Sequence, residues 1–253
     1  MKKILVVLLV LVLAIACVAC DNSNTTSNDD NKSVAPEAST NESVESSDES
    51  SEAVDVMSYA DFVAAELETL VCVETYVQAK QSWYENKGTF YTQNEEGAYF
   101  LYDMPCTEEE YNALTVGTKI RVTGYKAEWS GEVEIIEATY EILEGNYVAE
   151  PTDVTDLLGS EELINKQNML VSFTDLTIVE VEYKNGKPGD DIYVTVSKND
   201  AEFSFCVERY LTDPDTDVYK AFADIKAGDV VDIEGFLYWY NGVNTHITAV
   251  TVK

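Results

Sequence analysis

The chain has 253 residues, of which 47 are acidic and 16 are basic, so its formal net charge is −31 at pH 7. A surface this acidic repels the phosphate backbone of nucleic acids, whose recognition normally requires a basic footprint, and it also repels anionic lipid. The composition therefore predicts no nucleic-acid partner.

The first segment, residues 1–20, has the pattern of a secretion signal. Two lysines precede the apolar run "ILVVLLVLVLAIACVAC", which matches the basic start, apolar middle and small-residue end of such signals. A retained transmembrane anchor is the alternative, although the run of 17 residues is short for a span. The closing "CVAC", followed by a polar tract, resembles a bacterial lipobox, in which a lipid is joined to a cysteine after cleavage. We expect lipidation at Cys20, with Cys17 as the alternative.

The next segment, residues 21–55, is polar and acidic. It contains ten acidic residues, one lysine and no aromatic residue. Such a segment cannot bury enough apolar surface to offset the entropy lost on ordering. We therefore expect a disordered tether that holds a folded part away from a membrane. The remaining residues, 56–253, carry 37 acidic and 13 basic side chains, most of which we interpret as a solvated surface.

The first half of the remaining chain, residues 56–148, is predicted to be one domain. The stretch "SYADFVAAELET" predicts a short helix with Ser58 as its N-cap. Alternating apolar and polar residues then predict strands at "LVCVETYVQA", "GTFYTQ" and "GAYFLYDM". A second short helix, "TEEEYNAL", has Thr107 as its N-cap and acids in its first turn. Two further strands follow at "TKIRVTGYKAEW" and "EVEIIEATYEIL".

The second half, residues 149–253, repeats this order. A helix at "DLLGSEELINKQ" precedes strands at "MLVSFTDLTIVEVEY", "DIYVTVSK" and "EFSFCVERY". A helix at "DTDVYKAFADI", with Asp215 or Asp217 as its N-cap, precedes strands at "DVVDIEGFLYWY" and "THITAVTV". Three strands, a helix and two strands is the order of the OB-fold, a partly open five-stranded barrel. The sequence therefore predicts a mainly β protein with two tandem OB-fold-like barrels, each with short helices.

One glycine-rich phrase occurs in both halves. "LTVGTKIRVTGYKAEWSGEVEII" aligns without gaps to "IKAGDVVDIEGFLYWYNGVNTHI". The first glycine of each phrase lies between helix and strand, where the chain often needs positive φ. The second lies inside a strand where the apolar pattern changes phase, which indicates a β-bulge. The third belongs to a hairpin turn. In order, these glycines are Gly117, Gly124 and Gly131, and Gly228, Gly235 and Gly242.

Six aromatic residues fall in or beside the loops that flank the usual ligand-binding face of an OB-fold. Aromatic faces suit sugar rings and apolar side chains, and they need no cationic surround. The alternatives are that these rings pair across strands, seal the barrel mouth or pack between the two domains. We expect the first domain to be the main binder. The candidate ligand-binding residues are Trp83, Tyr84, Trp129, Tyr238, Trp239 and Tyr240.

Motifs for catalysis and metal binding are not found. The chain contains no nucleophile elbow, phosphate loop or zinc spacing, so we expect no enzyme activity, no cofactor and no metal. "DPDTD" resembles the start of a calcium loop, but Val218 stands where that motif requires glycine. One disulfide is possible among the three remaining cysteines, but their number and spacing do not require it. These cysteines are Cys72, Cys106 and Cys206. His246, the one histidine, is predicted to be a solvent-facing strand residue.

The stretches "ETYVQAKQSW", "GAYFLYD" and "GTKIRVTGYKAEWSGEVEI" carry a wider resemblance. With them, the whole chain, residues 1–253, resembles Gram-positive-type bacterial surface lipoproteins with tandem OB-fold domains. This resemblance implies the architecture and an extracytoplasmic, lipid-anchored location, and it implies no activity. The sequence therefore predicts a non-catalytic binding module for a glycan, a peptide or an envelope component. The alternative is a structural lipoprotein whose domains act only as a scaffold.

Overall fold

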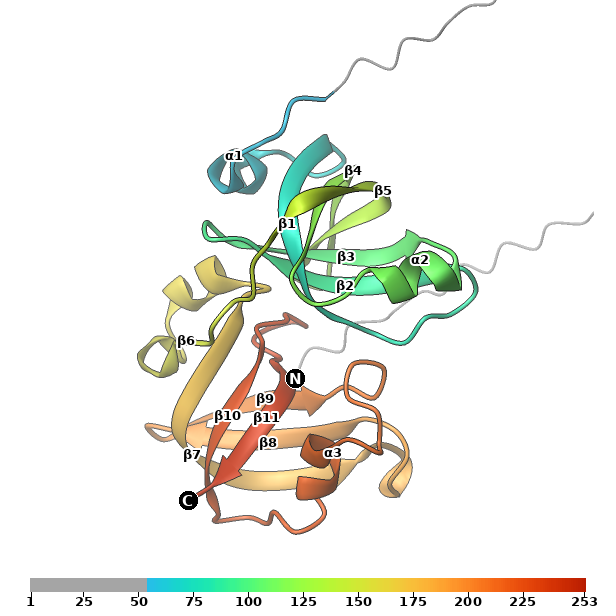
Figure 1. Ribbon diagram of the computed structural model, residues 1–253. Coiled ribbons are helices and arrows are strands. Elements are labelled where there is room, and N and C mark those ends of the chain that lie inside the picture. The colour runs from blue at the N-terminus through green and yellow to red at the C-terminus, as the bar shows by residue number, and fades with distance from the viewer. Residues whose placement is uncertain (1–53) are drawn as a thin grey trace, which may run out of the picture. The chain divides into compact units, whose positions relative to one another are not determined.

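The computed structural model describes residues 54–253. The predicted signal peptide, both candidate lipidation cysteines and the tether up to residue 53 lie outside the described residues. The described chain is mainly β, with two sheets and short helices (Figure 1). Both sheets belong to the same unit of the chain, residues 51–253, by their internal contacts.

The first sheet is a closed barrel with the strand order β1-β2-β3-β5-β4. The barrel closes because β4 also pairs with β1, and all neighbours are antiparallel except β3 and β5. The helix α1 precedes the barrel, and α2 lies between β3 and β4, where the sequence predicted a helix. The bounds are α1 Tyr59–Ala64, β1 Leu70–Lys80, β2 Lys87–Gln93, β3 Ala98–Pro105, α2 Glu108–Ala113, β4 Thr118–Trp129 and β5 Glu132–Asn146.

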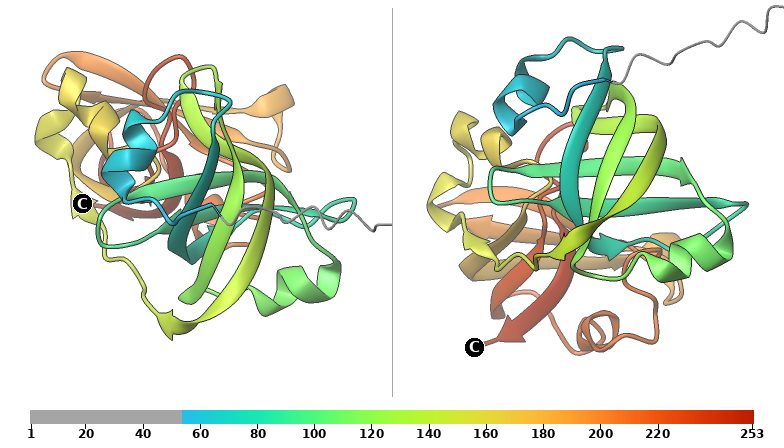
Figure 2. Two further views of the ribbon diagram at one scale, coloured as in Figure 1. Left: turned by 90° about the horizontal axis from the view of Figure 1, so that it is seen from above. Right: turned by 45° about the horizontal axis from the view of Figure 1, so that its top comes forward.

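The second sheet repeats this topology, with the order β10-β11-β9-β8-β7 and a further pairing of β10 with β7. Figure 2 shows the described chain from two further sides. A two-residue strand, β6, adds to the outside of β7. The prediction of two tandem OB-fold-like barrels is therefore confirmed. The bounds are β6 Thr152–Asp153, η1 Thr155–Leu157, η2 Glu161–Lys166, β7 Leu170–Tyr183, η3 Lys184–Gly186, β8 Ile192–Lys198, β9 Ala201–Val207, α3 Asp217–Ala221, β10 Val230–Phe236 and β11 His246–Val252.

Local capping explains where the helices begin. The Ser58 hydroxyl accepts the Asp61 N–H at the start of α1, and Thr107 forms a capping box at the start of α2, both as predicted. The predicted N-cap of α3 was wrong, because the hydroxyl of Thr216 accepts the capping hydrogen bond. The helix expected over 156–167 was also wrong. Gly159 has a φ of +81°, which interrupts the segment and leaves the two 3₁₀ turns η1 and η2.

The repeated glycines take the predicted conformations. Gly117 and Gly228 have positive φ, and the ladders shift register at Gly124 and at Gly235, as β-bulges do. At Gly124 a Cβ atom would lie 2.7 Å from Cγ2 of Ile135, so a side chain has no room there. The bulge lets the long strand β4 bend around the first barrel.

Each barrel has its own apolar core, and a third cluster joins the two. The joining cluster contains Tyr91 from β2, Phe100 from β3 and Phe236 from β10. In an OB-fold the outer face of strands two and three is the usual ligand face. Here six of the seven residues of β2 are buried, because the core covers one face and the second barrel covers the other. This face of the first barrel is therefore not accessible to a ligand, whereas the loop between β1 and β2 is exposed.

Candidate functional site

The predicted pair Trp83 and Tyr84 lies in the loop between β1 and β2. Trp83 packs against the core of the first barrel, and its indole Nε1–H donates to the carbonyl of Cys106 at 3.0 Å. Tyr84 is 70% exposed, and its hydroxyl donates to the Glu85 carboxylate at 2.8 Å. Trp83 therefore holds this loop against the core of the first barrel, whereas the Tyr84 ring is available to a ligand.

These two residues line a cleft of about 380 Å³, which we call the aromatic cleft. Tyr102 from β3 and Tyr210 from the segment after β9 line the same cleft, and 46% and 54% of their surfaces are exposed. The sequence pattern indicates neither residue, because "EFSFCVERY" predicts a continuous strand and Tyr102 has the pattern of an ordinary strand residue. The polar residues of the cleft are Gln81, Ser82, Lys87, Thr89 and Asp103.

The aromatic cleft combines neutral rings with a balanced ion pair. The Lys87 ammonium lies 3.1 Å from the Asp103 carboxylate, and both side chains are about half exposed. Burial raises the pKa of Tyr102, and the hydrogen bond to Glu85 raises the pKa of Tyr84. Both phenols therefore keep their protons well above neutral pH, so the cleft presents uncharged rings beside paired charges.

The predicted rings Trp129, Trp239 and Tyr240 come together at a second place. Each belongs to a repeated turn, and the two turns contact each other. The rings of Trp129 and Tyr240 are 5.2 Å apart between centroids, and both remain about half exposed. The Asn241 N–H donates to the carbonyl of Ser130 at 2.7 Å. Trp239 packs closely against Gly131, where a Cβ would lie 2.8 Å from Cδ1 of the indole. One copy of the repeated turn therefore packs on the other.

The remaining predicted residue, Tyr238, is partly buried between the barrels. Its ring stacks on His246 with the centroids 4.2 Å apart, and it meets Phe100 edge-on. His246 is buried, so the prediction that it faces solvent was wrong. Its Nδ1 lies 2.6 Å from the Tyr91 hydroxyl. Burial lowers the pKa of His246 to about 3, so the ring is neutral, and its Nδ1 shares a hydrogen bond with the Tyr91 hydroxyl. Residues of the first barrel cover His246, and the local sequence pattern does not reveal this contact.

Glu132, at the start of β5, is a buried carboxylate that the sequence analysis did not identify. Its Oε2 accepts the backbone N–H of Trp239 at 2.8 Å and the side-chain N–H of Gln167 at 3.2 Å, while Oε1 is buried without a partner. Burial raises its pKa well above the ordinary value, and no ion pair involves it within residues 54–253. In the sequence, Glu132 is one polar position of the alternating strand "GEVEII", and no sequence signal distinguishes it from an exposed strand residue. Glu132 therefore connects the two barrels as a buried hydrogen-bond acceptor.

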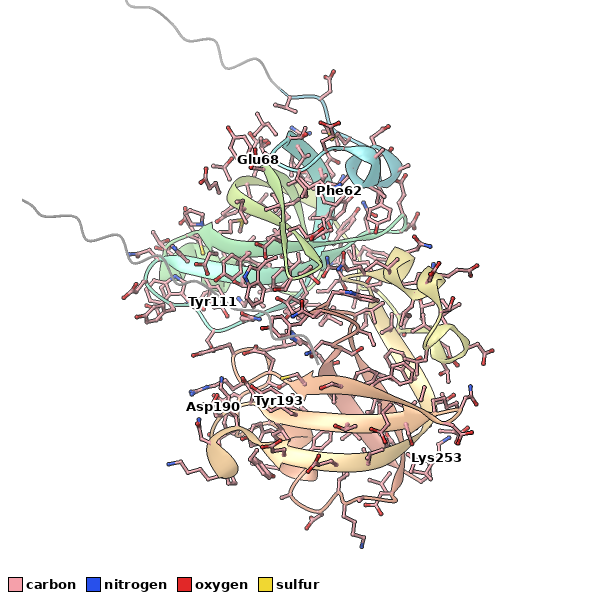
Figure 3. All side chains as sticks on the ribbon, turned by 180° about the vertical axis from the view of Figure 1, so that it is seen from behind. Phe62, Glu68, Tyr111, Asp190, Tyr193 and Lys253 are labelled. Carbon is pink, nitrogen blue, oxygen red and sulfur yellow. The ribbon has the colours of Figure 1, made fainter. Side chains whose placement is uncertain are left out.

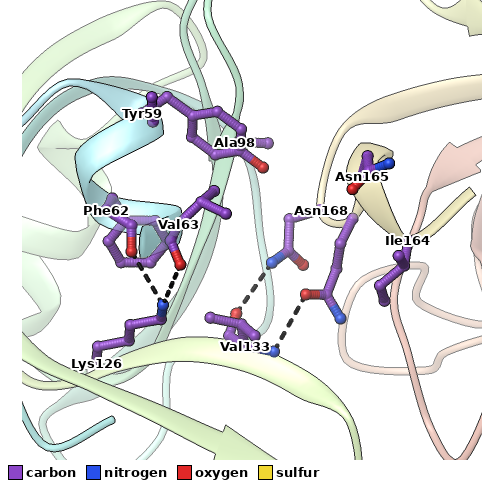
Figure 4. A pocket seen from close by; sticks show the side chains of 11 residues that line it. Tyr59, Phe62, Val63, Ala98, Lys126, Val133, Ile164, Asn165 and Asn168 are labelled. Atoms are coloured by element: carbon purple, nitrogen blue, oxygen red, sulfur yellow. Dashed lines mark hydrogen bonds between the residues drawn. The ribbon is translucent and has the colours of Figure 1, made fainter. Parts of the chain in front are cut away.

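A second cavity, of about 440 Å³, lies beside α1 (Figure 4). Its walls are mainly apolar, with Phe62 and Val63 from α1 and Ile164 from η2. The Lys126 ammonium at its edge donates to the carbonyls of Phe62, Val63 and Ala65 at 3.0, 2.9 and 2.7 Å, which also terminates α1 earlier than predicted. Because the three carbonyls surround this cation, it is not available to a ligand.

Metal and membrane features are not observed within the described part of the chain. Between residues 54 and 253, no group of three or more His, Cys, Asp or Glu side chains could hold a metal ion. Cys72, Cys106 and Cys206 are buried and free. Over the same residues, every helix is too short or too polar to cross a bilayer.

Comparison with known proteins gives matches of fold only. No protein-family model matches the sequence, and no curated protein does. Among solved structures, a murine DNA-binding protein bound with double-stranded DNA matches with a TM-score of 0.36 and 10% identity, over 72% of this chain and 94% of that chain. The Ifi202 HINa domain in complex with double-stranded DNA matches with a TM-score of 0.34 and 11% identity, over 74% and 97%. A replication protein A heterotrimer bound to single-stranded DNA matches with a TM-score of 0.31 and 10% identity, over 73% and 49%.

These matches correct one prediction. The net charge predicted no nucleic-acid partner, whereas the matched OB-fold structures include complexes with double-stranded and single-stranded DNA. The exclusion of nucleic acid was wrong, because net charge describes the whole surface, while a single strand also binds through base stacking on local aromatic rings. The likeness is one of fold and does not by itself assign a ligand to this chain.

Proposed function

We propose that this chain is an extracytoplasmic, lipid-anchored binding module without catalytic activity, which holds a glycan, a peptide or an envelope component in the aromatic cleft. The observation that carries this proposal is the exposure of Tyr84, Tyr102 and Tyr210 around one cleft. Large aromatic side chains that gather at a concave surface without covering one another favour a ligand site over a packing role. The lipid anchor is supported by "CVAC" and the acidic tract behind it.

A scaffold function is the second candidate, and a different observation favours it. The rings of the repeated turns serve the contact between the barrels, as Trp239 against Gly131 illustrates. If the rings of the aromatic cleft serve only to position the two barrels, the chain needs no ligand. The two functions differ in one testable respect, which is whether the exposed rings change environment when a ligand is added.

The test is a binding screen with the full chain against glycans, cell-wall fragments and peptides, repeated with Tyr84→Ala. Tyr84 is the better substitution site, because Trp83 also packs on the core and its loss would disturb the fold. Tyr125→Ala is the matched control, since Tyr125 is also an exposed tyrosine of the first barrel. A ligand that is lost in Tyr84→Ala and retained in Tyr125→Ala supports the proposal. A ligand that binds both variants equally lies elsewhere, and a screen without binding favours the scaffold.

A further inference from the structure

Residues of both barrels line the aromatic cleft. Trp83 and Tyr84 belong to the first barrel, while Tyr210 follows β9 of the second. The N–H of Ser82 donates to the carbonyl of Tyr210 at 2.7 Å, and the Ser82 hydroxyl lies 3.3 Å from the same oxygen. These contacts use the backbone of Tyr210 and leave its ring free. The second barrel therefore presents an exposed ring at a loop of the first.

The segment that carries Tyr210 is held by its own hydrogen bonds. The Glu208 carboxylate accepts the N–H groups of Tyr210 at 3.1 Å and Leu211 at 2.9 Å. Leu211 packs against the apolar cluster that joins the barrels. On the other side, the guanidinium of Arg209 lies 5.1 Å from the centroid of the Tyr210 ring. Because the backbone of Tyr210 and one face of its ring are held in this way, the ring loses little freedom when a ligand stacks on its other face, which favours binding.

The polar groups of the cleft suit an uncharged ligand that has hydroxyl groups. Among the residues that line the cleft, Lys87 is the one cation, and its ammonium is already paired with Oδ2 of Asp103. The Arg209 guanidinium is not part of this lining and lies against the Tyr210 ring. Oδ1 of Asp103 makes no hydrogen bond within residues 54–253. The Gln81 side-chain N–H donates to Tyr91, which leaves its amide oxygen as an acceptor. Carboxylate and amide oxygens accept from hydroxyls, and aromatic faces cover the C–H faces of sugar rings.

From these observations, and resting on the proposed function, we infer that the aromatic cleft is a composite site for a neutral glycan, to which the first barrel contributes Tyr84 and the second contributes Tyr210. The hydroxyls of the glycan pair with Asp103 and Gln81. A ligand that binds only when both barrels are in contact also stabilises that contact, by mass action.

The test is an NMR titration of the full chain with cellotetraose and with an oligomer of N-acetylglucosamine as neutral probes. An acidic uronic-acid oligomer, a short peptide and a short oligothymidylate are the comparison probes. Tyr84→Ala and Tyr210→Ala are each expected to weaken binding of a neutral probe by about 5- to 150-fold, the range that corresponds to the stacking of a nucleic-acid base on an aromatic side chain. The Trp83 indole N–H resonance should move on binding. Tyr125→Ala and Tyr193→Ala are matched controls, because each removes an exposed tyrosine outside the cleft, Tyr125 from the first barrel and Tyr193 from the second. Figure 3 labels Tyr193 in the second barrel.

The outcomes separate this inference from the proposed function. If Tyr84→Ala weakens glycan binding and Tyr210→Ala does not, the site is not composite, although the binding module stands. If only the peptide or the oligothymidylate binds, and both variants weaken it, the glycan assignment is overturned and the cleft stands. If no probe moves the resonances of the cleft residues, the proposed function is overturned together with this inference. Thermal unfolding of each variant checks that the fold is retained.

Discussion

Replacing the buried carboxyl of Glu132 by an amide should make the stability of the protein less dependent on pH. The folded pKa of this group is raised well above its ordinary value of 4.5. The folded state therefore holds the proton more tightly than the unfolded state does. Its contribution to stability is fully present below about pH 4.5 and is lost as the pH rises through the folded pKa. Glu132→Gln removes this titration, so its stability should fall less than that of the wild type between about pH 5 and pH 8.

The magnitude follows from the size of the pKa difference. Each pKa unit between the folded and unfolded states corresponds to about 1.4 kcal/mol of unfolding free energy. The amide oxygen of the variant can still accept the N–H groups of Trp239 and Gln167. The amide nitrogen replaces Oε1, which has no partner, and an unpaired buried donor costs about 1–3 kcal/mol. That cost is the same at every pH, so it moves the whole curve without changing its slope.

The assay is urea unfolding of both proteins at several pH values. Burial also raises the pKa of Glu134 and of Glu208 to about 7. Glu208 titrates in either protein and cancels in the difference, whereas the charge of Glu134 raises the pKa of Glu132 and belongs to the pH dependence that the variant removes. Glu128→Gln is the control, because Glu128 is an exposed carboxyl of the same hairpin. Equal slopes for the wild type and Glu132→Gln would show that Glu132 is ionised in the folded protein, which would contradict this prediction.

Three further predictions concern the fold and the anchor. Lys126→Met should lower the unfolding free energy by about 1.5–3 kcal/mol, because three carbonyls lose a charged donor; an unchanged urea midpoint would contradict this. Gly124→Ala should destabilise the first barrel by about 1–3 kcal/mol, since its Cβ would lie 2.8 Å from the Ile136 carbonyl oxygen; a thermal midpoint equal to that of the wild type would contradict it. Replacing Cys17 and Cys20 together by alanine should abolish labelling of the protein by a fatty-acid analogue in cells, and labelling that persists would exclude lipidation there.

The order of strands and helices was predictable because local signals determine it. Strand alternation, the capping residues Ser58 and Thr107, and the phase change at Gly124 depend on residues that are close in sequence. Where several local donors compete, prediction fails more easily. At α3, Thr216 provides the cap instead of either neighbouring aspartate. At the end of β9, the Glu208 carboxylate captures two following N–H groups and ends the strand earlier than its pattern indicates.

The candidate site was less predictable, because contacts between the barrels decide it. Tyr84 was identified from its loop, but Tyr210 joins the cleft through a segment 126 positions further along the chain. His246 and Glu132 look like ordinary polar strand positions, and their burial depends on the other barrel. A pattern of alternating residues describes one sheet and its own core. The pattern does not show that the other barrel covers His246 and Glu132 and so removes their side chains from water.

The covered outer face of β2 and β3 has a consequence for the newly made chain. The first barrel is synthesised before the second, and Tyr91 and Phe100 then have no partner from β10. About 100 residues remain to be added after the first barrel is complete, which takes roughly 5–20 seconds at usual elongation rates. During that time the nascent barrel exposes an aromatic surface that can associate with other chains. Slower elongation of the second half would therefore lower the yield of correctly assembled protein, even though the finished molecule is unchanged.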